Sequence, residues 1–176
     1  MPYIVGLLGL VAAAFFWASR ARDAARVTHE LSNMAGDVLG AARRFGFRRR
    51  ANTHPVENID DPKLAIGGVG LAFLELGGLP SREDQDALIA AFENRLGLTP
   101  AIAEEIMVLG RWLVNESGGP QSAINRIARR LVKIGGIETL DPLMKVLNDT
   151  ATSGRGGLST RQKEALEEIA RLFRLS

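Results

Sequence analysis

Residues 81–97 read SREDQDALIAAFENRLG, and this stretch shows the pattern that most of the chain follows. Ser81 belongs to the residue types that cap helix N-termini, and Gly97 is the type that most often ends a helix. Between them the apolar residues recur every three or four positions, which is the period of one helix face. The stretch therefore predicts an amphipathic helix whose core-facing residues are Leu88, Ile89, Phe92 and Leu96.

The same period and the same punctuation continue from residue 61 to the C-terminus. Asp61-Pro62 and Thr99-Pro100 each offer a cap followed by a proline in the first turn. No alternating pattern is long enough to indicate a strand. The sequence therefore predicts an all-α bundle of about six helices joined by short loops. The expected helices cover about 62–76, 82–96, 100–117, 121–134, 138–151 and the region after Ser159 or Thr160. The third is expected to bury Ile102, Ile106, Leu109, Trp112 and Leu113.

Three glycines lie inside the first expected helix, in Gly67-Gly68-Val69-Gly70. A glycine-rich nucleotide loop would follow a strand, and no strand is expected before this stretch. Glycine inside a helix costs about 1 kcal/mol relative to alanine. We therefore expect these glycines to permit close contact between helices.

The first nineteen residues, Met1 to Ser19, carry no charged side chain. A spanning helix needs about 17–25 apolar residues, and this run is at the short end of that range. A cleaved signal peptide would carry basic residues before the run and small residues at its end, where Phe15-Phe16-Trp17 stands. A buried core helix is the other alternative, but the position at the N-terminus and the apolar character all round the helix argue against it. The sequence therefore predicts a retained transmembrane anchor over residues 1–19.

Aromatic and basic residues flank this segment. Tyr3 and Trp17 are expected near the two membrane interfaces, and the basic residues that follow are Arg20, Arg22 and Arg26. The positive-inside rule then places the N-terminus outside and the rest of the chain in the cytoplasm. The expected location is the bacterial inner membrane, with a single crossing.

Residues 20–50 hold eight arginines against three acids, a net charge of +5, whereas residues 51–176 have a net charge of −3. A seam of apolar residues predicts an amphipathic juxtamembrane helix, which offers a possible surface for homo-oligomers over residues 24–45. Residues 51–60 have no apolar period and are expected to be a linker. The arginines at the end of this helix are expected to act first as a topology signal, second in contact with anionic headgroups and only distantly in nucleic-acid binding: Arg43, Arg44, Arg48, Arg49 and Arg50.

Two stretches of the helical region repeat each other. Gly77-Gly78-Leu79-Pro80-Ser81 precedes one helix, and Gly156-Gly157-Leu158-Ser159 precedes another. In each, the glycine pair is expected to permit a tight turn and the leucine to fix that turn to the core. This arrangement over residues 61–176 resembles the tellurite-resistance protein B-like (TerB-like) family, as in the TerB-like part of membrane-anchored DnaJ-like co-chaperones. The J-domain tripeptide His-Pro-Asp is not found in the sequence.

The resemblance implies an all-helical domain and, in the family, a metal site at Asp-Gly turns. Here Leu76 and Arg155 stand at the positions that match those aspartates. A calcium- or magnesium-like ion needs several converging oxygen ligands. The expectation is therefore no metal and no cofactor, with an alternative, metal-responsive stress domain that would use Glu75, Glu83, Asp84 and Asp86.

No pattern predicts catalysis. His29-Glu30-Leu31-Ser32-Asn33 lacks the second histidine of the helical zinc-protease motif, and the absence of cysteine excludes thiolate sites. The expected protein is a non-enzymatic, membrane-anchored interaction or scaffold protein, with a role in envelope or stress response and an unidentified protein partner. One further basic patch is expected to be a solvated helix face or, as the alternative, to contact lipid or an acidic partner: Arg126, Arg129, Arg130 and Lys133.

Overall fold

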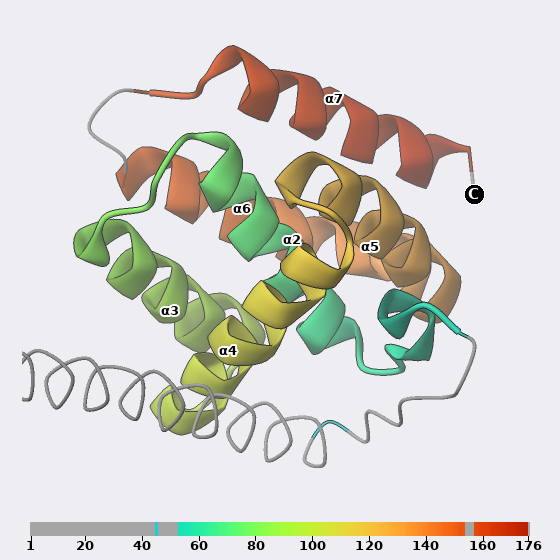
Figure 1. Cartoon of the computed structure of the whole chain (residues 1–176), viewed down its shortest axis with the longest axis horizontal. Helices are drawn as coiled ribbons and strands as arrows, with labels where there is room; N and C mark the ends of the chain where they lie inside the picture. Colours follow the sequence, from blue (N-terminus) through green and yellow to red (C-terminus); the bar gives the residue numbers. More distant parts are fainter. Residues whose placement is uncertain (1–44, 46–52, 154–156, 176) are drawn as a thin grey trace, which may run out of the picture. The chain divides into compact units, whose positions relative to one another are not determined.

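Six α-helices and two short 3-10 helices make up the part of the chain that the structure describes (Figure 1). The structure is a computed structural model, and it describes residues 45, 53–153 and 157–175. These ranges contain no strand, so the predicted all-α class is confirmed for them. In chain order the elements are η1 (Pro55–Asn58), α2 (Pro62–Leu76), α3 (Arg82–Leu96), α4 (Pro100–Glu116), α5 (Pro120–Gly135), η2 (Ile137–Thr139), α6 (Leu140–Ser153) and α7 (Thr160–Arg174).

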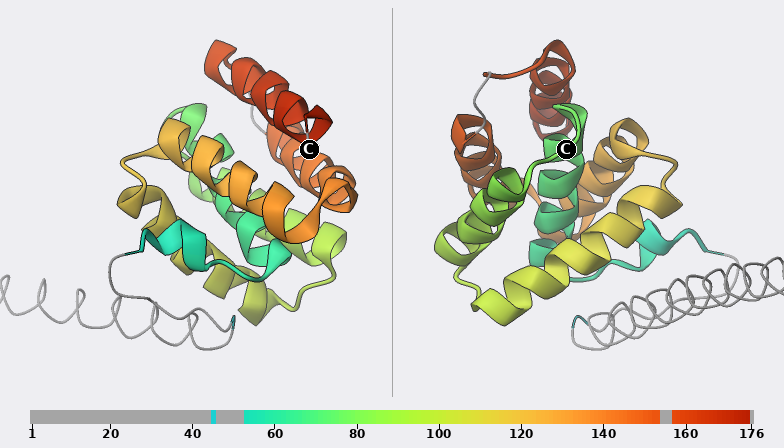
Figure 2. Two further views of the ribbon diagram at one scale, coloured as in Figure 1. Left: turned by 90° about the vertical axis from the view of Figure 1, so that its right-hand side faces the viewer. Right: turned by 60° about the vertical axis from the view of Figure 1, so that its left-hand side comes forward.

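Helix α2 runs through the middle of the bundle and packs against α4, α5 and α6, as Figure 2 shows from two sides. Every residue from Leu64 to Leu74 is buried. The sequence allows this burial because no charged residue lies between Lys63 and Glu75. A helix that is apolar all round is stable only when other elements surround it, and α2 is the core around which the bundle forms.

The glycines of α2 bring neighbouring helices close, as predicted. A Cβ atom at Gly67 would overlap the Cγ2 methyl of Ile106 in α4, and one at Gly68 would lie 3.1 Å from the Cδ1 atom of Ile127 in α5. Gly110 of α4 faces Gly68, since a Cβ added at Gly110 would lie 3.6 Å from the Cα atom of Gly68. Backbone therefore meets backbone where α2 and α4 cross.

Three helix N-termini are capped by residues that the sequence predicts for this role. The Asp61 carboxylate accepts a hydrogen bond from the Lys63 amide at 2.8 Å, and Ser81 and Ser159 each form a reciprocal capping box. Gly97 ends α3 with a φ of 62°, in the left-handed region that favours glycine. Thr99 precedes α4 but its side chain makes no capping hydrogen bond.

The buried face of α4 agrees with the prediction in part. Ile106, Leu109 and Leu113 are fully buried. Ile102 and Trp112 are only partly buried and pack at the edge of the core. They are at the border of the apolar stripe, where periodicity alone does not distinguish a core position from a rim position.

Part of the expected linker belongs to the bundle. Pro55–Asn58 form η1, and both Val56 and Ile59 are fully buried in the core. The prediction of a linker over 51–60 is therefore wrong for these residues. Two buried aliphatic side chains are too few to give an apolar period, so the sequence pattern did not reveal them.

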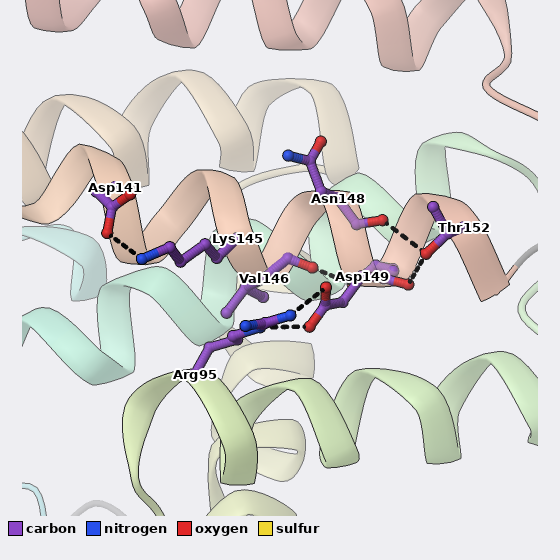
Figure 3. A network of polar contacts seen from close by, with 8 residues as sticks. Arg95, Asp141, Lys145, Val146, Asn148, Asp149 and Thr152 are labelled. Atoms are coloured by element: carbon purple, nitrogen blue, oxygen red, sulfur yellow. Dashed lines mark hydrogen bonds and ion pairs between the residues drawn. The ribbon is translucent and has the colours of Figure 1, made fainter.

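Polar contacts join α3 to α6 at the surface (Figure 3). The Arg95 guanidinium donates to both carboxylate oxygens of Asp149, at 2.7 and 3.0 Å. The hydrogen bond from Arg95 holds the pKa of Asp149 below its usual value. Along α6, Lys145 pairs with Asp141 at 2.7 Å. These exposed pairs contribute little to stability, and of the two the Arg95–Asp149 pair is the one that joins α3 to α6.

Candidate functional site

The outer face of α5 is the most strongly charged helix face that the structure describes in full. Its inner face packs into the core through Ile124, Ile127 and Leu131, all fully buried. This apolar spacing leaves the other side of the helix to solvent. Three of the four predicted basic residues lie there and are exposed: Arg126, Arg129 and Lys133.

Arg130, the fourth predicted member, has a structural role instead. Its Nε atom donates to the Ile59 carbonyl oxygen at 2.7 Å, and its Nη2 atom lies 2.8 Å from Asp60 Oδ1. Only 13% of the Arg130 side chain is exposed. Arg130 therefore fastens the segment before α2 to α5 and is not available to a lipid or an acidic partner, contrary to the prediction.

A second contact fastens the same segment to α4. The His54 Nε2 atom lies 3.1 Å from the Glu116 carbonyl oxygen, at the C-terminal end of α4. Its Nδ1 atom accepts a hydrogen bond from the Val56 amide at 3.3 Å and caps η1. Carbonyls at a helix end lack intrahelical donors, so the imidazole satisfies one of them.

An exposed aliphatic side chain follows the basic face of α5. Ile137, the first residue of η2, is 58% exposed. The turn before it is tight, since Gly136 has a φ of 61° and Thr139 Oγ1 donates to the Gly136 carbonyl at 2.8 Å. Helical periodicity does not predict an exposed role for Ile137, although its position directly after Gly135-Gly136 indicates that it lies outside the helical face.

The acids of the metal alternative serve other contacts in part. Asp84 accepts hydrogen bonds from the Ser81 amide at 2.9 Å and hydroxyl at 2.8 Å. Glu75 lies 3.9 Å from Arg111, and burial raises its pKa while Arg111 partly offsets the rise. Glu83, in the first turn of α3, and Asp86, in the next turn, are exposed. Within the described ranges, no group of three or more His, Asp or Glu residues is arranged to hold a metal ion.

The N-terminal predictions lie outside the described residues, with Phe45 as the exception. Phe45 is partly buried and packs against the core of the bundle. None of the helices in the described ranges combines the length and the apolar character that a membrane crossing requires. The predicted anchor over 1–19, the oligomer seam over 24–45 and these site residues stay predictions: Tyr3, Trp17, Arg20, Arg22, Arg26, Arg43, Arg44, Arg48, Arg49 and Arg50.

Comparisons with protein-family models, with curated proteins and with solved structures found no match to this chain. The assignment of a functional surface therefore rests on the chemistry of the chain's own residues. Among the described residues, that chemistry is most distinctive on α5, where exposed cations stand beside an exposed isoleucine.

Proposed function

We propose that the chain is a single-pass, membrane-anchored, non-enzymatic protein that presents its helical bundle to the cytoplasm as an interaction or scaffold module. The observation that carries the proposal is the uncharged run Met1–Ser19 directly followed by Arg20, Arg22 and Arg26. An apolar run of this length with cations on one side is typical of an anchor with its C-terminal side in the cytoplasm.

The bundle supports the second half of the proposal. The described core is built from residues 56–173, with α2 at its centre. A folded helical unit joined to an anchor would be held near the membrane, where its surfaces meet partners at raised effective concentration. The exposed cations of α5 are the surface best suited to such a contact.

The resemblance to TerB-like domains belongs to the same proposal. It is supported by two helices, α3 and α7, that begin with the same capping box after a glycine and a leucine. It is weakened by the turn residues, because Leu79 and Leu158 differ in burial. A role in envelope or stress response is part of this proposal and depends on the resemblance alone.

Cysteine accessibility tests the proposed topology. Because the natural chain has no cysteine, single cysteines placed by Pro2→Cys and by Asn94→Cys report separately on the N-terminus and on exposed α3. In intact spheroplasts, a maleimide that cannot cross membranes should label the first variant. It should label the second only after lysis. Labelling of Asn94→Cys without lysis, or recovery of the chain in the soluble fraction, would overturn the proposal.

A further inference from the structure

The basic face of α5 is unusual in lacking any compensating acid. No Asp or Glu occurs in α5 itself, and within the described part of the chain no acidic side chain pairs with Arg126, Arg129 or Lys133. The three cations span about 10 Å along the helix at 1.5 Å per residue. Uncompensated like charges on one face repel each other, so an anionic surface opposite them would relieve that repulsion.

Ile137 adds an apolar contact at the end of this face. It lies in a tight turn, where the backbone of Gly135 closely approaches Thr139. A Cβ atom at Gly135 would overlap the Cγ2 methyl of Thr139, which is 9% exposed. The isoleucine is therefore exposed by the fold rather than by a flexible loop. Glu138 follows it and is exposed, so it reduces the positive charge of the surface without cancelling it.

We propose that Arg126, Arg129, Lys133 and Ile137 form a surface that docks the bundle onto anionic lipid headgroups. This inference rests on the proposed membrane anchor and specifies a second contact with the bilayer. An acidic protein surface would satisfy the cations, but a bilayer interface accepts both the cations and an exposed aliphatic side chain. The combination therefore favours lipid as the occupant.

The size of the effect follows from the number of cations. Each lysine or arginine near an anionic membrane strengthens binding about fivefold, so three together give a gain of about 100-fold. Salt screens such contacts over a Debye length of about 8 Å at physiological ionic strength. The contact should therefore weaken strongly as salt is raised, whereas a hydrophobic anchor should not respond.

The test uses the full chain in lipid nanodiscs of neutral phosphatidylcholine, with or without anionic phosphatidylglycerol. Ser122 is exposed one turn before Arg126, so Ser122→Cys places an environment-sensitive fluorophore beside the cations. We expect a blue shift and quenching by lipid-borne quenchers in anionic discs only. The variant with Arg126→Gln, Arg129→Gln and Lys133→Gln should lose about 100-fold in response to anionic lipid, and Ile137→Ser should weaken it further.

A matched control removes the same charge elsewhere. Lys63→Gln, Arg82→Gln and Lys163→Gln neutralise three exposed cations on other helices and should leave the response unchanged. An equal loss in this control, no difference between the lipids, or a response to polyglutamate but not to anionic discs would overturn the docking surface. Glu138→Gln should strengthen binding, and a weaker response would contradict the assignment.

Co-elution with neutral discs reports separately on the anchor. A chain that co-elutes but shows no change in anionic discs keeps the anchor and overturns the α5 surface. A chain that fails to co-elute with neutral discs, yet responds to anionic ones, overturns the anchor and supports the α5 surface.

Discussion

Two turns of the bundle share a sequence pattern but differ in what they contact. The turn before α3 contains Leu79, whose side chain is fully exposed. Its cap partner Asp84 accepts hydrogen bonds from the amide and the hydroxyl of Ser81. The turn before α7 contains Leu158, which packs against the core. Its cap partner Gln162 is buried and donates from Nε2 to the Phe73 carbonyl oxygen at 3.1 Å.

The α7 turn shows that a capping box can also make a contact with another helix. In both turns the serine hydroxyl accepts from the amide three residues later. At α7 the cap partner Gln162 also reaches another helix, where it satisfies one of the last carbonyls of α2, which intrahelical donors cannot reach. The expectation that each leucine fixes its turn to the core is therefore right for Leu158 and wrong for Leu79.

The largest expected effect comes from disturbing α2, because the turn before α3 follows this helix and the cap of α7 contacts it. Gly67→Ala places a methyl group into the Cγ2 atom of Ile106, a branch close to the α4 backbone that cannot rotate away. Overpacking of this kind costs about 1–3 kcal/mol and exceeds the roughly 1 kcal/mol gained from alanine's helix propensity. Because the overlap is severe, we expect the upper end of this range and a net loss of about 2 kcal/mol in the free energy of unfolding, measured by urea denaturation.

Gly110→Ala is the control for that substitution. Its Cβ would meet Leu71 at an ordinary 3.5 Å, so the helix-propensity gain should dominate and stability should be unchanged or higher. If Gly67→Ala were as stable as Gly110→Ala, the close approach of α2 and α4 would be contradicted.

Substitution of the two cap partners should lower the free energy of unfolding by different amounts in the two turns. Gln162→Ala leaves the buried Phe73 carbonyl without its donor and removes a cap contact, so a loss of about 1–1.5 kcal/mol is expected. Asp84→Ala removes the cap contacts with Ser81 at the start of α3, so a loss of about 0.5–1 kcal/mol is expected. Thermal unfolding of both variants measures the difference. Equal losses would show that the contact between Gln162 and the Phe73 carbonyl adds no stability.

The leucines give a smaller difference in the same direction. Leu158→Ala removes a partly buried side chain and should cost about 1 kcal/mol, since burial of a whole leucine is worth about 1.5–3 kcal/mol. Leu79→Ala should leave the unfolding midpoint in urea unchanged, because the side chain is fully exposed. A loss at Leu79 comparable to that at Leu158 would mean that the first turn also packs against the core.

The smallest effect concerns Glu75, just before the first turn. Because burial raises its pKa, the protonated form suits the fold better, and this contribution is lost as the pH rises through the raised pKa. Glu75→Gln should therefore raise the free energy of unfolding by less than about 1 kcal/mol at pH 7. The gain should vanish near pH 4, which denaturation at the two pH values measures. A gain that persists at low pH would exclude ionisation as its cause.

Periodicity and punctuation in the sequence were enough to predict the helices. Ser81, Ser159 and Asp61 cap the helices for which they were predicted, because caps depend on residues within one turn. The sequence could not predict that Arg130 binds Ile59, since the two are far apart in the chain and join only when α5 packs. For the same reason it counted Arg130 with the exposed cations, although the positions of Arg126 and Arg129 on the outer face were correct.

The fastening of residues 54–60 has a mechanical consequence. A pull on the chain from its N-terminal side would load this segment before it reached the first turn of α2. Arg130 holds the Ile59 carbonyl and Asp60, while His54 meets the end of α4, so tension would be shared between two helices. Val56 and Ile59 would have to leave the core before α2 could be peeled from it. Residues 54–60 would therefore bear a force applied from the N-terminal side and protect α2 from it.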